Sequence, residues 1–154
     1  MARITCRTPS TRPLAIALAN VGTAFVTIAE APDFSVPDTQ QIYPDRDPLD
    51  AARGIRPGEI FILTPIKARN KSGATTWIEA QVLRESGAAV LLERIAVPAG
   101  ETVQIVTQGL SLLKRLPAAA FGDRLQVRAE SAAAFDVFGA GQERPSAEHI
   151  GVVA

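Results

Sequence analysis

Apolar and polar residues alternate with a period of two along much of the chain beyond residue 58. The alternation is regular in residues 123–130 (DRLQVRAE) and is also present in residues 75–84 (TTWIEAQVLR). This spacing is typical of a β-strand with one face in a core and the other in water. The residues expected to face the core in these two segments are Ile78, Ala80, Val82, Leu125, Val127 and Ala129.

Turn-forming clusters separate the alternating segments, as at Asn70–Gly73, Glu85–Gly87 and Pro98–Gly100. Strands recurring about every 12 residues between such clusters indicate an antiparallel sandwich or barrel. We therefore predict an all-β fold, an antiparallel β-sandwich of jelly-roll or immunoglobulin-like type. The predicted strands are residues 14–19, 24–29, 59–69, 75–84, 88–97, 101–108, 123–130 and 134–138, with 109–115 as a strand continuation or a short turn.

Residues 13–31 have two interpretations. Asn20, Gly22 and Thr23 interrupt the apolar run after six residues, which favours a hairpin of two strands joined at Asn20–Gly22. The alternative is a signal segment, because arginines precede the run and small residues follow it. The run is shorter than the roughly 20 apolar residues of a membrane-spanning helix, and we predict no membrane insertion.

Residues 31–58 change character, with five of the eleven prolines and several aspartates. Proline lacks an amide donor, so a central strand is excluded and a long loop excursion is predicted. Asp47 and Pro48 are typical of the start of a short helix over 48–53. The predicted organisation is an N-terminal arm (1–12), one sandwich domain (13–139, containing the 31–58 excursion) and a C-terminal tail (140–154).

Composition narrows the function classes. The chain has 154 residues, 16 basic and 16 acidic residues, one Cys and one His. The balanced charge gives no basic patch for nucleic acid. Cys6 and His149 are too few for a Cys- or His-based metal site and fall in the predicted arm and tail. We expect no cofactor and no enzymatic activity.

Three aspartates stand close together at Asp45, Asp47 and Asp50. A calcium-binding loop of EF-hand type needs Gly at its sixth position and Glu at its twelfth, where this chain has Asp50 and Arg56. A solvated loop with a helix cap is therefore favoured. An unrecognised carboxylate site of a hydrolase is the remaining alternative.

Trp77 and Tyr43 are candidates for stacking on a sugar ring, although a single Trp beside Ile78 is more often part of a core or an interface. With Asp45, Asp47 and Asp50 they form the set of possible interface or ligand contacts. Asn70-Lys71-Ser72 matches a glycosylation sequon, but the same residues suit a turn, which we favour.

Five segments between Asn70 and Glu143 carry a resemblance to small β-rich structural proteins of tailed bacteriophages and gene transfer agents. These are NKSG…TWIEAQVL (70–83), VPAGETVQI (97–105), QGLSL (108–112), GDRLQVRA (122–129) and AFDVFG (134–139). The resemblance implies a virion component of the tail tip, tail fibre, baseplate or neck, and it implies no catalytic residue.

The sequence thus predicts a structural subunit of a phage-like particle that attaches a fibre or contributes to host contact. Expected partners are other virion or tail proteins, further copies of the chain and a host-surface glycan. The expected location is the virion, assembled in the bacterial cytoplasm. The alternative is a cell-surface or secreted β-sandwich module that binds a glycan or a protein.

Overall fold

The computed structural model describes residues 11–32, 58–115 and 121–145. Within these ranges the chain forms nine β-strands and no helix. The strands are β1 (Arg12–Leu18), β2 (Val26–Glu30), β3 (Gly58–Asn70), β4 (Thr76–Leu83), β5 (Ala89–Val97), β6 (Thr102–Val106), β7 (Ser111–Lys114), β8 (Arg124–Ala129) and β9 (Phe135–Pro145).

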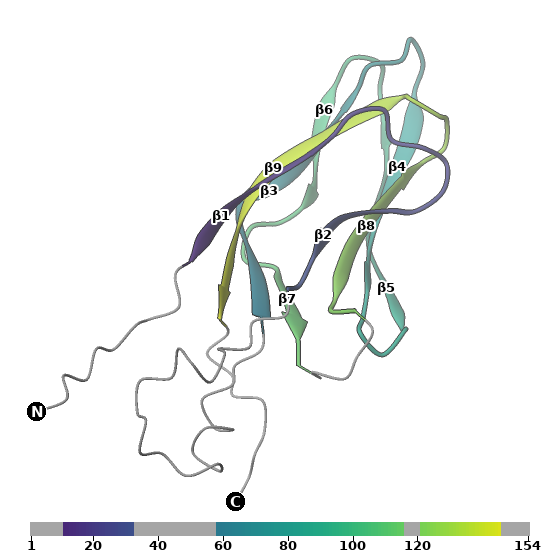
Figure 1. Cartoon of the computed structure of the whole chain (residues 1–154). Helices are drawn as coiled ribbons and strands as arrows, with labels where there is room; N and C mark the ends of the chain where they lie inside the picture. The colour runs from purple at the N-terminus through teal and green to yellow at the C-terminus, as the bar shows by residue number, and fades with distance from the viewer. Residues whose placement is uncertain (1–10, 33–57, 116–120, 146–154) are drawn as a thin grey trace, which may run out of the picture.

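The strands form two antiparallel sheets packed face to face as a β-sandwich (Figure 1). One sheet has the order β1-β9-β3-β6, with β7 also paired to β3, and the other has the order β2-β8-β4-β5. β7 pairs with Gly58–Phe61 and β6 with Ile66–Arg69. The two short strands therefore lie along β3 as one interrupted strand.

The connections identify the sandwich as a jelly roll. With β6 and β7 taken as one strand, the chain changes sheet at every connection except that from β4 to β5. In an immunoglobulin-like sandwich several consecutive strands are neighbours in the same sheet. The predicted all-β sandwich is thus confirmed, and the strand order decides between the two types that the sequence left open.

The core lies between the sheets, where alternate residues of each strand meet. All six residues predicted to face it from segments 75–84 and 123–130 are at most 1% exposed. Burying one Val, Leu or Ile side chain contributes about 1.5–3 kcal/mol. The largest fully buried side chains include Phe135, Ile16, Ile60, Ile62, Ile66, Ile78, Leu112 and Leu125.

Residues 13–31 form two strands, as predicted, but not a hairpin. β1 pairs with β9 in one sheet, and β2 pairs with β8 in the other. The link between them is tied to β9 and its preceding turn, since the Val21 amide donates to Phe135 O (2.9 Å) and the Ala133 amide donates to Val21 O (3.0 Å). Val21 is completely buried, so this link packs against the core through the Val21 side chain.

The cluster at Asn70–Gly73 is a turn, as predicted, but it also joins the two sheets. Asn70 is fully buried, and its side-chain nitrogen donates to the carbonyl oxygens of Ala74 and Val97, each at 2.8 Å. Its side-chain oxygen accepts from the amide and the hydroxyl of Ser72. Both amide protons of the sequon asparagine are therefore engaged inside the protein.

The boundary predicted at residue 140, between the sandwich domain and a tail over 140–154, is wrong. β9 continues to Pro145 and lies between β1 and β3, so residues 140–145 belong to the sandwich. Two glycines of β9 allow close strand contact. A Cβ atom on Gly139 would lie 2.8 Å from Cγ1 of Ile66, and one on Gly141 would lie 3.1 Å from the Phe61 carbonyl oxygen. Residues 146–154 lie outside the described ranges.

Candidate functional site

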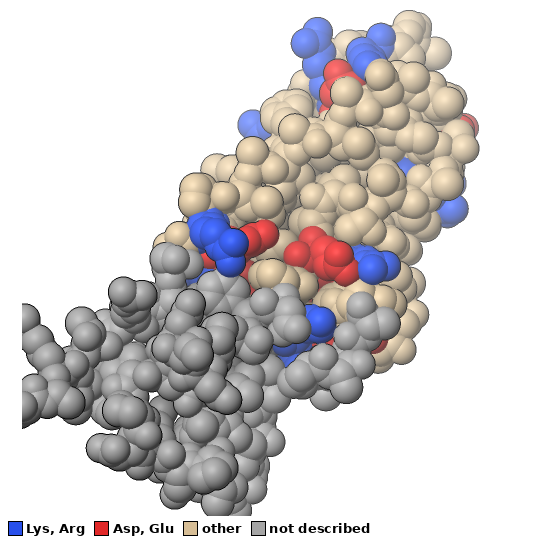
Figure 2. Space-filling view, viewed as in Figure 1, with Lys and Arg blue, Asp and Glu red and all other residues tan. Residues whose placement is uncertain are grey.

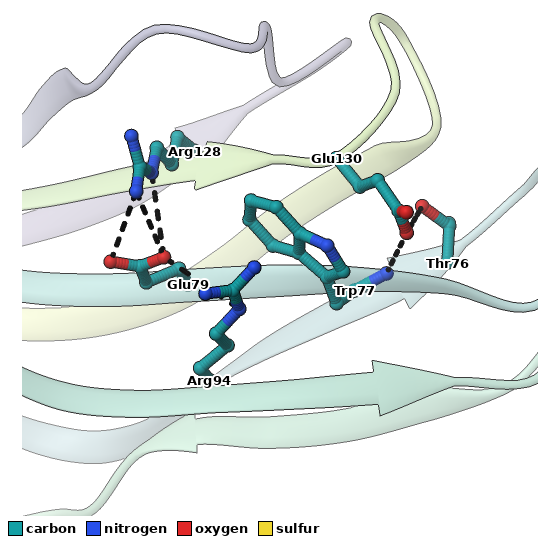
Figure 3. Close-up of polar contacts among 6 residues, drawn as sticks. All are labelled: Thr76, Trp77, Glu79, Arg94, Arg128 and Glu130. Atoms are coloured by element: carbon teal, nitrogen blue, oxygen red, sulfur yellow. Dashed lines mark hydrogen bonds and ion pairs between the residues drawn. The ribbon is translucent and has the colours of Figure 1, made fainter.

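The outer face of the four-stranded sheet carries a cluster of arginine, glutamate and aromatic side chains, drawn in Figure 3. Alternation in β4 buries Ile78 and Ala80 in the core and turns Trp77 and Glu79 to the outer face. Glu79 lies directly across from Arg128 of β8 and from Arg94 of β5 in the strand register. Cross-strand neighbours of opposite charge stabilise a sheet face.

Glu79 is the centre of this cluster. Nη2 of Arg128 donates to its Oε2 (3.2 Å) and Oε1 (3.5 Å), and Nε of Arg128 donates to Oε2 (3.4 Å). Nε of Arg94 lies 3.9 Å from Oε2 on the other side. The two arginines cover the carboxylate so well that Glu79 is only 7% exposed. One buried negative charge is thus held between two positive charges.

The same arginines cover aromatic rings. The guanidinium carbon of Arg94 lies 4.0 Å from the centre of the Trp77 ring, and that of Arg128 lies 4.4 Å from the Phe25 ring and 5.9 Å from Trp77. Glu130 accepts from the Trp77 amide and the Thr76 hydroxyl, both at 3.2 Å. Arginines stacked on aromatic rings are typical of contact surfaces as well as of rigid sheet faces.

Of the five predicted contact residues, the structure describes only Trp77. Its indole is half-buried on the outer face, with Arg94 over one side of the ring. Stacking of a sugar on the covered side would require Arg94 to move. Tyr43, Asp45, Asp47 and Asp50, together with the predicted helix over 48–53, lie outside the described residues.

Glu79, Arg94 and Arg128 were not predicted as partners from the sequence. Arg128 and Glu79 were visible as polar positions of alternating strands, but only the register of β4 with β8 and β5 brings them together. Pairing between strands that are distant in sequence leaves no local signal.

A second feature is the end of the sandwich at which the described chain stops and resumes, called here the attachment end. In the strand register Arg12 is opposite Glu143, and Gly58 is opposite both Pro145 and Lys114. Pro32 adjoins Gly58, and Gly122 adjoins Ala31 and Lys114. The described residues that flank segments 1–10, 33–57, 116–120 and 146–154 therefore all lie at this end of the sandwich (Figure 1).

Two buried acids tie the strands together at the attachment end. Glu59 accepts from the Ser111 hydroxyl (2.8 Å) and from Nε of Arg144 (3.0 Å), whose guanidinium lies 4.3 Å from the centre of the Phe61 ring. This repeats on the five-stranded sheet the glutamate–arginine–aromatic pattern that surrounds Glu79.

Asp123 is the second buried acid, only 1% exposed. It accepts from Nη1 of Arg84 (3.1 Å) and from the amides of Glu85 (3.1 Å) and Leu113 (3.2 Å). The carboxylate joins β7, the start of β8 and the turn after β4. It therefore braces the strand ends that flank segment 116–120.

Charges at the surface occur in mixed pairs. Figure 2 shows basic and acidic side chains next to each other in small groups, with a broad uncharged area between them. Such pairs include Arg124–Glu30 at 2.8 Å and Lys71–Asp136 at 3.0 Å. A hydrogen bond from the Asn20 amide, together with Lys71, lowers the pKa of Asp136 below its ordinary value.

Within residues 11–32, 58–115 and 121–145, no three His, Cys, Asp or Glu side chains are grouped as metal ligands. The described ranges contain no helix with the length and apolar character needed to cross a membrane. No protein-family model matches the chain, and comparison with curated proteins finds no significant match.

Proposed function

We propose that this protein is a non-enzymatic structural component of a phage-like particle, a tail-fibre or baseplate-associated subunit that attaches the fibre or contributes to host contact. The observation that carries the proposal is the attachment end. The strand ends that flank the four segments outside the described residues lie together there, braced by two buried carboxylates.

This arrangement suits a subunit that is held by its neighbours. A sandwich with a continuous core presents a rigid body, and strand ends that lie together at one pole give that body one side for contacts. Double-sheet jelly rolls occur in viral capsid and lectin domains. The fold alone does not define a function, and the proposal rests on the attachment end.

The resemblance of residues 70–143 to phage and gene-transfer-agent structural proteins supports the same proposal. Its partners would be other tail or virion proteins and further copies of this chain. Assembly would take place in the bacterial cytoplasm, before release of the particle.

Gene deletion tests the proposal. A strain that releases phage-like particles is compared with the same strain lacking this gene and with a complemented strain. Electron microscopy of the deleted strain should show particles without a fibre or baseplate element, or particles that fail to bind host cells. Particles of normal shape that bind host cells normally would contradict the proposal.

The half-buried Trp77 beside Glu79 and Arg128 favours a second candidate, a β-sandwich module that binds a glycan or a protein. Trp77 is the only Trp of the chain, so its fluorescence reports directly on this surface. A saturable change of that fluorescence with a host-surface glycan would favour this function. An unchanged spectrum across a panel of such glycans would count against a glycan ligand at Trp77.

A further inference from the structure

Four arginines of the described sandwich stack on aromatic rings. Three of them lie 4.1 to 4.4 Å from the centre of a phenylalanine ring, namely Arg124, Arg128 and Arg144. Each of these three also donates a hydrogen bond to a glutamate, at 2.8 Å for Arg124, 3.2 Å for Arg128 and 3.0 Å for Arg144. The fourth, Arg94, stacks on Trp77 at 4.0 Å. These stacks can therefore be compared within one molecule.

Arg94 differs from the other three in its polar contacts. Within the described residues its ionic contact is with Glu79, where the distance from Nε to Oε2 is 3.9 Å and too long for a hydrogen bond. That carboxylate is already bound by Arg128 through three hydrogen bonds. The side chain of Arg94 is 52% exposed, against 32%, 36% and 35% for the other three arginines. Its N–H donors therefore point to solvent.

The stack on Trp77 orients the guanidinium of Arg94 (Figure 3). A guanidinium carries five N–H donors in one plane, and this arrangement matches a carboxylate through two parallel hydrogen bonds. A group held in place before binding loses less conformational entropy when a ligand arrives. Because Arg128 already neutralises Glu79, the positive charge of Arg94 can be matched by an external anion. The guanidinium, rather than the indole that it covers, is therefore the group presented to a ligand.

A row of uncharged polar groups lies next to this charged cluster. Gln81 is two residues beyond Glu79 on β4 and so shares its outer face. Nε2 of Gln81 donates to Oε1 of Gln126 (2.9 Å), and Nε2 of Gln126 donates to the Thr27 hydroxyl (3.3 Å). Amide and hydroxyl groups of this kind suit the hydroxyl groups of a sugar. An acidic peptide supplies carboxylates but few hydroxyl groups, so the combination favours an acidic sugar.

We propose that Arg94 binds the carboxylate of an acidic sugar, such as a uronic acid unit of a host-surface glycan. The hydroxyl groups of the same sugar bind the row formed by Gln81, Gln126 and Thr27. Trp77 contributes by holding Arg94 in position, and the sugar does not displace Arg94 from the ring. The inference rests on the host-contact part of the proposed function, because it names the chemical class of the ligand and the residue that selects it.

Isothermal titration calorimetry of the purified full-length chain tests the proposal. The probes are a panel of oligosaccharides from bacterial surfaces that contain uronic acids, each paired with its carboxyl-reduced form, in which CH2OH replaces the carboxylate. Hexaglutamate serves as the acidic peptide. Arg94→Gln is compared with Arg124→Gln, a matched control on the same sheet whose guanidinium also stacks on a ring but is hydrogen-bonded to Glu30. Thermal unfolding checks that both variants fold.

We expect at least one acidic oligosaccharide to bind, with a dissociation constant raised about tenfold or more by carboxyl reduction or by Arg94→Gln and unchanged by Arg124→Gln. The proposal is overturned if no acidic oligosaccharide binds, if the reduced form binds equally well, or if both substitutions weaken binding equally. Hexaglutamate binding as tightly as the best oligosaccharide would also overturn it. The presence of the protein in particles is measured separately, so failure of this inference is distinguishable from failure of the proposed function.

Discussion

The backbone of Pro32 occupies the space that a side chain at Gly58 would need. A Cβ atom on Gly58 would lie 2.7 Å from the carbonyl carbon of Pro32 and closer still to its oxygen. The two residues flank the segment 33–57, so the predicted excursion leaves and re-enters the sandwich at one point. This contact defines the attachment end.

Gly58→Ala should therefore destabilise the sandwich. The new methyl group would overlap backbone, which can yield only by moving a strand, and we expect a loss of about 2 kcal/mol or more in the free energy of unfolding. Gly73→Ala is the matched control, since a Cβ atom there meets nothing within 4 Å. Urea unfolding measures both variants. Equal stability of the two would contradict the close contact.

Asp123→Ala should also be strongly destabilising. Asp123 is buried and accepts from Arg84 and from the amides of Glu85 and Leu113. Its removal leaves these donors without their acceptor, at a cost of about 2–4 kcal/mol. Asp136→Ala, at an exposed pair, provides the comparison and should cost much less. The prediction fails if chemical denaturation gives similar values for both substitutions.

Arg94→Ala should expose the indole of Trp77. The guanidinium lies over the ring at 4.0 Å, and its loss opens that side to solvent. Because the chain has a single Trp, acrylamide quenching of its fluorescence should increase. Arg69→Ala, on the opposite sheet, should leave quenching unchanged. No increase in the Arg94 variant would show that Arg94 does not cover the ring in solution.

The carboxyl group of Asp136 should have a pKa below the ordinary value of an aspartate. The Asn20 amide and Lys71 favour its charged form, so folding depresses the pKa. The resulting stabilisation is present above the unfolded-state value and is lost as pH falls through the folded-state value. NMR titration should show the pKa rising in Lys71→Met. An unchanged pKa in that variant would exclude a contribution from Lys71.

The strands could be predicted from the sequence, but their connections could not. Alternation within a strand is a local property, and it correctly placed Ile78 and Leu125 in the core. The turn at Asn20–Gly22 also has a local signal, but which sheet the next strand joins depends on distant partners such as Phe135. A jelly roll depends on many such long-range pairings.

The same dependence on long-range strand pairing explains why most residues of the candidate site were not predicted. Trp77 was noticed because aromatic residues are rare in this chain, with eight in all. The partners Glu79, Arg94 and Arg128 came together only through the register of three strands. Residues 140–145 were placed in a tail, whereas β9 continues through them and its glycines allow close contact with β3.

Mass spectrometry of purified, nuclease-treated particles tests the central claim most directly. If the protein is a particle subunit, its peptides should co-purify with the tail and capsid proteins through a density gradient, at a constant ratio across the particle peak. A soluble cytoplasmic protein of the same cells serves as the control for carry-over. Absence of the protein from the particle peak, with the protein abundant in the cell lysate, would contradict the account.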